Sequence, residues 1–212
     1  MNVILIFTVL YGIFPLITYS FNRNKKSNEI SPILPFVILT FVASIYEFVF
    51  TFLLKFSIKY WLVVYNFLAF FIISYYYRKI LNDNKKVYFK VSYILFFILL
   101  FYVFFNWNRY EIIVLSSYMD SFQTSFVLIF SILWFKKIFN ELNYDSLLNN
   151  PNFHFIAGLL LYYCGTLVLF LMSNSLYTDN KSMFQYYLLL NVVLNLVIRT
   201  LLIIGIWKTR VK

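Results

Sequence analysis

Residues 87–105 read VYFKVSYILFFILLFYVFF, with Lys90 as the one charged side chain in the stretch. A helix needs about 20 mostly apolar residues to cross roughly 30 Å of hydrocarbon. Lys90 lies near the start of the stretch, so its long side chain can reach the lipid headgroups. The stretch therefore predicts a transmembrane helix.

The same pattern recurs along the whole chain. The apolar runs are continuous and do not alternate with a period of two, which favours helices over a membrane barrel. We expect an all-α, polytopic membrane bundle formed by one domain, residues 1–212. Its seven predicted spans are 2–21, 33–54, 58–77, 87–105, 112–135, 153–172 and 183–207.

Three local features refine this prediction. Pro15 lies inside the first span and predicts a kink there. The first span opens at Met1 without a basic leader, so we expect a retained helix and not a cleaved signal peptide. Only residues 55–57 separate the second span from the third, which predicts a tight helical hairpin.

The composition supports a lipid environment. Hydrophobic residues make up 62% of the 212 residues and charged residues only 12%, whereas a soluble domain is about half apolar and about a quarter charged. The net charge of +10 could suggest nucleic acid as a partner. We expect no nucleic-acid binding, because the basic residues lie in short connections between apolar spans and not on one face.

The distribution of Lys and Arg predicts the orientation, because cytoplasmic loops carry the excess of these residues. Thirteen fall on one side and four on the other, and Arg199 lies inside the last span. We therefore expect the N-terminus outside and the C-terminus in the cytoplasm, in a bacterial inner membrane. The thirteen are Arg23, Lys25, Lys26, Arg78, Lys79, Lys85, Lys86, Lys90, Lys136, Lys137, Lys208, Arg210 and Lys212, and the four are Lys55, Lys59, Arg109 and Lys181.

Three ionisable residues lie well inside the predicted spans: Glu47, Asp120 and Arg199. Such a residue costs roughly 2.5–3.5 kcal/mol on insertion scales and raises a functional question by default. At 1.5 Å per residue, Glu47 lies about 10 Å and Asp120 about 12 Å below the outer ends of their helices. Asn66 and Asn191 lie at a similar depth in the third and seventh spans.

Helical spacing places further polar residues beside these. Gln123 lies at the margin of a stripe that includes Asp120, and Asn191, Asn195 and Arg199 follow one another at intervals of four residues. Polar stripes avoid lipid, so we expect them to face the interior of the bundle.

Two interpretations of the polar residues remain open. Glu47, Asn66, Asp120, Gln123 and Asn191 could line an outward-opening cavity that binds a small ligand. They could equally form hydrogen bonds between helices as packing contacts, each worth about 0.6 kcal/mol.

Arg199 has two interpretations of its own. It could extend to the cytoplasmic headgroups, or it could pair with an acid deeper in the bundle. We do not expect a direct bond to Asp120, which lies about 12 Å higher by helical rise.

No catalytic or cofactor motif is present in the sequence. A catalytic zinc site normally uses three protein ligands, and the chain has one histidine, His154, and one cysteine, Cys164. The H-E-x-x-H, G-x-S-x-G and Walker patterns do not occur. The last span contains no lysine that could hold retinal as a Schiff base. We therefore expect neither an enzyme nor a bound metal or cofactor.

Three segments carry a resemblance. These are residues 149–155 (NNPNFHF), residues 158–165 (GLLLYYCG), and residues 191–195 leading into 205–208 (GIWK). Together they resemble small uncharacterised seven-helix membrane proteins of Bacteroidota-type bacteria. They are also similar to the seven-helix sensor modules that such bacteria place beside sensor kinases. The resemblance implies a receptor-like role with a separate signalling partner, such as a sensor kinase, because the fused sensors carry an output domain that this chain lacks.

The leading hypothesis from the sequence is a non-enzymatic sensor or signalling accessory subunit that binds a small ligand from the outer side. The alternative is a small-solute or proton-coupled transporter that uses the same cavity. An intramembrane lipid-modifying enzyme is a third class. The lipid bilayer is the one partner that the composition itself implies, and the sequence leaves the oligomeric state open.

Overall fold

The computed structural model describes residues 10–22, 31–56, 59–81, 86–106, 112–141, 147–179 and 181–211. Within these ranges the chain is helical and contains no strand, which confirms the prediction of an all-α fold. The elements are α2 (Phe14–Asn22), α3 (Leu34–Tyr46), the π-helix η1 (Glu47–Leu53), α4 (Lys59–Ile80), α5 (Lys86–Phe105), α6 (Ile112–Glu141), the short 3₁₀ helix η2 (Leu147–Asn149), α7 (Pro151–Asp179) and α8 (Lys181–Val211).

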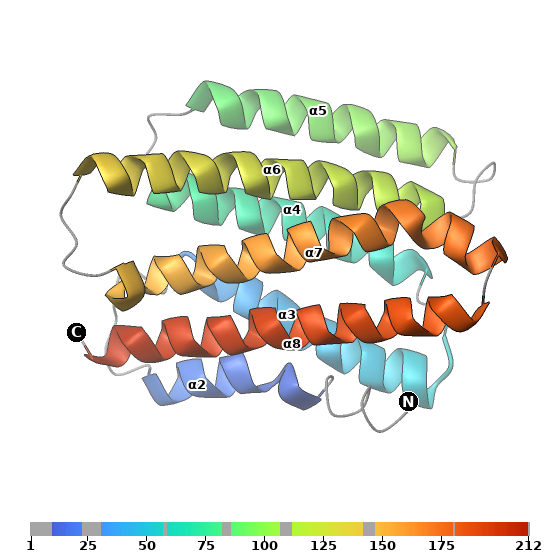
Figure 1. Ribbon diagram of the computed structural model, residues 1–212, viewed down its shortest axis with the longest axis horizontal. Helices are drawn as coiled ribbons and strands as arrows, with labels where there is room; N and C mark the ends of the chain where they lie inside the picture. Colours follow the sequence, from blue (N-terminus) through green and yellow to red (C-terminus); the bar gives the residue numbers. More distant parts are fainter. Residues whose placement is uncertain are drawn as a thin grey trace.

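The helices lie side by side, and each successive long helix runs in the opposite direction to the one before it (Figure 1). As a result, one end of the bundle collects the C-terminal ends of α4, α6 and α8 and the start of α5. That end carries basic residues, and we call it the basic end; its described cations include Arg78, Lys79, Lys86, Lys136, Lys137 and Lys208.

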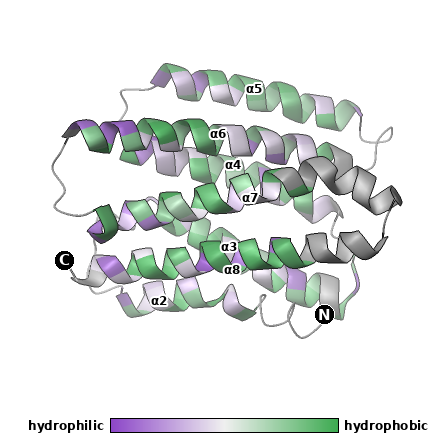
Figure 2. Cartoon of the chain, in the orientation of Figure 1, coloured by the Kyte–Doolittle hydropathy of each residue, from purple (hydrophilic) through white to green (hydrophobic). Residues whose placement is uncertain are grey.

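Four helices are long and apolar enough to cross a membrane, namely Tyr60–Ile80, Lys86–Phe105, Leu115–Asn140 and Leu189–Thr209. Figure 2 shows that hydrophobic residues dominate the middle of the helices and that hydrophilic residues gather toward their ends. α5, at one edge of the bundle, turns large apolar side chains outward, with Ile94, Phe101 and Phe105 at least 61% exposed. A surface this apolar is suited to lipid.

The last three helices extend beyond their predicted spans. α6 continues past Phe135 to Glu141, α7 runs from Pro151 to Asp179, and α8 begins at Lys181. Hydropathy marks where the apolar character ends, whereas a helix ends where its backbone hydrogen bonds stop. Polar residues such as Asn140 are therefore still helical, although they lie beyond the apolar stretch.

The second predicted span forms α3 and then changes to the π-helix η1 at Glu47. Pro35 lies in the first turn of α3, where its missing N–H leaves no bond unmade. The backbone N–H of Leu54 bonds the carbonyl of Val49 at 3.0 Å, five residues earlier. Lys55 then adopts a φ of 55°, a left-handed turn that reverses the chain toward α4.

The first predicted span is broken where the sequence predicts a kink. Gly12 and Ile13 form a turn just before α2 begins at Phe14. Pro15 has no N–H to donate, and its ring would collide with the carbonyl of Tyr11 in a continuous helix. The break lets the chain pass close to α3 and α8, because a Cβ atom on Gly12 would overlap Ser44 and lie 3.0 Å from the Cζ of Arg199. Residues 1–9 of this span lie outside the described residues.

The half of the bundle nearest the basic end is filled by large side chains. Tyr76, Tyr77 and Phe155 are fully buried. The Tyr77 hydroxyl lies 2.6 Å from Ser131 Oγ on α6, and the Tyr76 hydroxyl donates to Asn152 Oδ1 on α7 at 3.0 Å. These contacts join α4, α6 and α7 into one packed core.

α7 and α8 pack closely because glycines lie where the two helices meet. A Cβ atom on Gly205 of α8 would overlap the ring of Phe155. A Cβ atom on Gly158 of α7 would lie 3.2 Å from the Cβ of Leu201, which is tight but attainable. Small residues of this kind allow close approach of helices in membranes.

Gly205→Ala is expected to lower the free energy of unfolding by about 1–3 kcal/mol through overpacking, because the buried Phe155 ring has nowhere to move. Gly158→Ala is the matched control, since both changes gain the same helix propensity. Thermal unfolding in detergent measures the difference between them. Equal melting temperatures for the two variants would contradict the packing described for α7 and α8.

Candidate functional site

A polar cavity of about 140 Å³ lies inside the bundle, between α3, η1, α4, α6, α7 and α8. Six of its lining residues carry amide or charged side chains that the sequence singled out, and the others are mainly aromatic or small. The first group is Glu47, Asn66, Asp120, Asn191, Asn195 and Arg199, and the second is Thr40, Ala43, Trp61, Leu62, Tyr65, Tyr162 and Tyr163.

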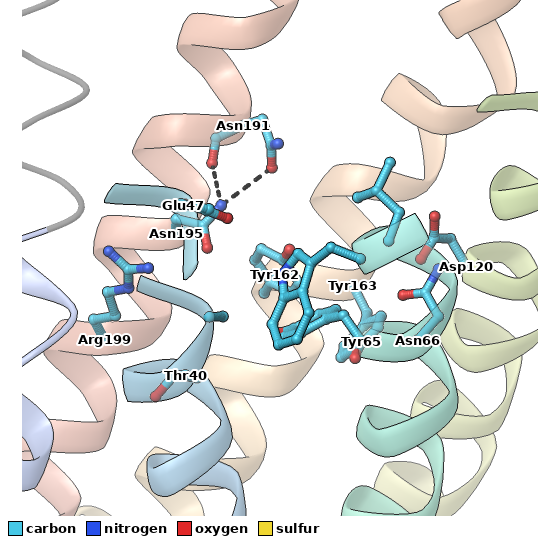
Figure 3. Close-up of a pocket in the computed structure, with 13 residues that line it drawn as sticks. Thr40, Glu47, Tyr65, Asn66, Asp120, Tyr162, Tyr163, Asn191, Asn195 and Arg199 are labelled. Carbon is cyan, nitrogen blue, oxygen red and sulfur yellow. Dashed lines mark hydrogen bonds between the residues drawn. The ribbon is translucent and has the colours of Figure 1, made fainter. Parts of the chain in front are cut away.

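The cavity has two polar ends separated by aromatic side chains (Figure 3). Asp120 and Asn66 lie at one end, and Glu47, Asn195 and Arg199 lie at the other. Tyr65, Tyr162 and Tyr163 are placed between them. Glu47 and Asp120 therefore face the same cavity from opposite sides.

The first end joins α6 to α4. Asp120 is 7% exposed and Asn66 is 4% exposed. The Asn66 amide lies beside the Asp120 carboxylate. Thr124, one turn along α6, donates to the Asp120 carbonyl at 2.9 Å and lies 3.2 Å from the Tyr163 carbonyl on α7. The backbone around Asp120 is thereby fixed against two neighbouring helices.

Gln123, which the sequence offered both as a lining residue and as a packing contact, is not among the residues that line the cavity. Its Nε2 atom donates to the Asn66 carbonyl at 2.5 Å, and its Oε1 atom accepts from the Tyr163 hydroxyl at 3.0 Å. The side chain is 1% exposed. For this residue the packing interpretation holds, because its amide bonds α4 on one side and α7 on the other.

The second end is built around Arg199 of α8. Its guanidinium is 5% exposed and donates from Nη2 to Ser44 Oγ on α3 at 3.1 Å. The positive charge of Arg199 attracts the Glu47 carboxylate one turn farther along. Arg199 is thus held within the bundle against α3, where its direct bond is to Ser44 and its attraction to Glu47 acts over a longer distance.

Glu47 is the first residue of the π-helix and is half-buried. Among the described residues its carboxylate forms no hydrogen bond and no ion pair within bonding distance. It faces the cavity and Arg199 and is available to a ligand.

Asn191 and Asn195 lie one above the other on α8, as the spacing predicts. The Asn195 Nδ2 atom donates to the Asn191 carbonyl at 3.0 Å and lies 3.3 Å from the Asn191 Oδ1 atom. Both side chains are half-buried and line the cavity. Together with Arg199 they give this end both hydrogen-bond donors and acceptors.

The aromatic part of the lining was not predicted from the sequence. The chain contains 19 Tyr and 27 Phe, and a single tyrosine on an apolar helix carries no sign of which face it occupies. The adjacency of Tyr65 to Asn66 was the one available signal, since both belong to the same turn of α4. Trp61, one turn away, stacks on Tyr46 with ring centroids 4.3 Å apart.

Comparisons of this chain with protein-family models, with curated proteins and with solved structures found no match. Among the described residues, no three His, Cys, Asp or Glu side chains come close enough together to hold a metal ion.

Gln123→Met should weaken the fold through the loss of two bonds between helices. The isosteric change leaves the Tyr163 hydroxyl buried without its partner, at a cost of about 1–2 kcal/mol. Adding Tyr163→Phe removes that hydroxyl, so the double variant should recover part of the stability. Chemical denaturation in detergent measures both. If the two losses simply add, the Gln123–Tyr163 bond is not the stabilising contact.

Proposed function

We propose that this chain is a multi-pass membrane protein that binds a small ligand from the outer side and acts as a receptor-like sensor or signalling accessory subunit. In this proposal seven helices cross a bacterial inner membrane, with the N-terminus outside and the C-terminus in the cytoplasm. The observation that carries the proposal is the polar cavity, which five helices and η1 line inside an otherwise apolar bundle.

The orientation is supported by the alternating direction of the helices. The basic end holds most of the described cations, while Lys55 and Lys59 lie at the opposite end. Because Lys and Arg are retained on the cytoplasmic side, the basic end is assigned to the cytoplasm.

Access from the outer side is supported by where the lining residues lie along their helices. Trp61 is the third residue of α4, and Glu47 follows the last residue of α3. Both belong to the half of the bundle away from the basic end. A ligand entering from outside would therefore meet the cavity before it met the packed core.

A sensor is favoured over a transporter by the packing below the cavity. Tyr76, Tyr77 and Phe155 fill the half nearest the basic end and are tied to neighbouring helices by hydrogen bonds. A solute crossing the membrane would need these rings to part. Binding at the cavity needs no such movement.

The π-helix η1 supports a conformational response. π-Helical turns are rare and occur frequently at functional sites. Glu47 starts η1 and also lines the cavity, so a ligand bound at Glu47 acts directly on a segment that can change its helical register. The likeness of the chain's last part to sensor modules supports a separate signalling partner, such as a kinase, as the receiver.

The double variant Glu47→Gln with Asp120→Asn is expected to abolish any ligand-dependent stabilisation or signalling while the protein still folds. Both changes keep side-chain size and remove only the charges that face the ligand. Glu141→Gln with Asp145→Asn, in the connection between the fifth and sixth predicted spans, is the charge-matched control. The melting temperature of the purified protein, screened against small polar solutes, provides the measurement. An unchanged response in the double variant would remove the cavity as the binding site.

Liposome uptake separates the sensor from the transporter. Purified protein reconstituted with a solute that stabilises it should bind that solute and move none across the bilayer. If the liposomes with protein accumulate more solute than protein-free liposomes, the protein is a transporter and the sensor assignment is wrong.

A further inference from the structure

The charges that line the cavity do not balance. Two carboxylates, Glu47 and Asp120, face one guanidinium, Arg199, which leaves one formal negative charge. The positive charge of Arg199 attracts the Glu47 carboxylate, and the guanidinium donates a hydrogen bond to Ser44. Asp120, at the opposite end, has an uncharged partner, Asn66.

Asp120 therefore has no cationic partner among the residues that the structure describes. It is 93% buried, being 7% exposed, and no described cation bonds to it. A buried ionised carboxylate without a cation is strongly disfavoured, because its hydration is lost, and either a proton or a positively charged ligand can neutralise it. Since Asp120 faces the cavity, a ligand placed there can supply the missing charge.

The wall between the two ends is suited to an organic cation. The side chains of Tyr65 and Tyr162 lie between Asp120 and Glu47. Aromatic rings attract ammonium groups through the negative charge of their faces. Among the described residues, neither hydroxyl of this pair bonds another side chain, so both can donate to a ligand.

The volume of the cavity limits the size of the ligand. A cavity of roughly 150 Å³ accepts a molecule the size of benzene, and this one measures about 140 Å³. The ligand therefore has on the order of six heavy atoms.

We propose that the ligand of this cavity is a small organic ammonium ion whose charged nitrogen lies against Asp120. This inference rests on the proposed binding function and specifies its ligand class. Tyr65 and Tyr162 contact the cation, and Asn191, Asn195 and Arg199 at the other end receive a polar group such as a hydroxyl. The charges of Glu47 and Arg199 cancel, so Asp120 determines the selectivity for positive charge.

Three probes of nearly equal size test the charge preference: propylammonium, 1-propanol and propionate. Isothermal titration calorimetry on the purified full chain in lipid nanodiscs at neutral pH measures their affinities. We expect propylammonium to bind at least about tenfold more tightly than 1-propanol, a difference of about 1.4 kcal/mol, and propionate to bind most weakly. Equal affinities for propylammonium and 1-propanol, or a preference for propionate, would overturn the inference.

Two variants test whether Asp120 and Tyr65 cause the preference for propylammonium. Asp120→Asn should remove the advantage of propylammonium over 1-propanol and leave the affinity for 1-propanol within about twofold of the wild type, since only the charge is lost. Tyr65→Leu should weaken propylammonium binding by removing the ring. Ser125→Ala is the control, because Ser125 is exposed and its hydroxyl bonds only its own helix. An Asp120→Asn variant that keeps the full preference for the cation would contradict the assignment.

The outcomes separate this inference from the proposed function. If 1-propanol or propionate binds and Glu47→Gln abolishes that binding, the cavity is a binding site and only the cation assignment fails. If none of the three probes binds, the inference fails, and stabilisation by other solutes that depends on Glu47 and Asp120 would still support the proposed function.

Discussion

Burying charged side chains among apolar helices is the constraint on which the rest of this fold depends. On insertion scales each such group costs roughly 2.5–3.5 kcal/mol at the centre of a membrane, and this chain carries Glu47, Asp120 and Arg199 within its apolar segments. Arg199 donates to Ser44 and attracts Glu47, which ties α8 to α3 and η1. Asn66 lies beside Asp120, and its carbonyl accepts from Gln123, which ties α4 to α6. The positions of five elements follow from the need to bring these groups together.

The two halves of the bundle arrange their buried polar groups differently. Near the basic end, tyrosine hydroxyls find partners on neighbouring helices and aromatic rings fill the remaining space, so the core is closed. In the other half, the polar side chains surround a cavity. Local backbone irregularities lie beside it: the π-helix begins at Glu47, and the break at Gly12 lets the chain pass over Arg199. A closed half joined to an irregular half would suit the proposed sensor, in which a bound molecule changes the irregular half.

Hydropathy predicted the helices, and the rise of 1.5 Å per residue predicted a similar depth for the polar residues. α4 and α5 begin within one residue of the predicted spans, because Lys59 and Lys86 coincide with the polar boundary. Helical spacing also brought Asn191, Asn195 and Arg199 onto one face. It also predicted that Gln123 faces the interior, but not that its amide bonds α4 and α7 instead of lining the cavity, which packing decides. Neither the π-helix nor the tyrosine lining could be predicted, since both depend on contacts between helices that are distant in sequence.

The central claim is that successive helices cross a bilayer in alternate directions, so that the buried charges are sheltered from lipid. Single cysteines at Phe56, in the turn between η1 and α4, and at Lys86, at the start of α5, test it in a Cys164→Ser background. Both positions are exposed. In intact cells, a membrane-impermeant thiol reagent should label the cysteine at position 56 and reach the one at position 86 only after the cells are opened. Labelling of both positions from the same side would contradict the arrangement.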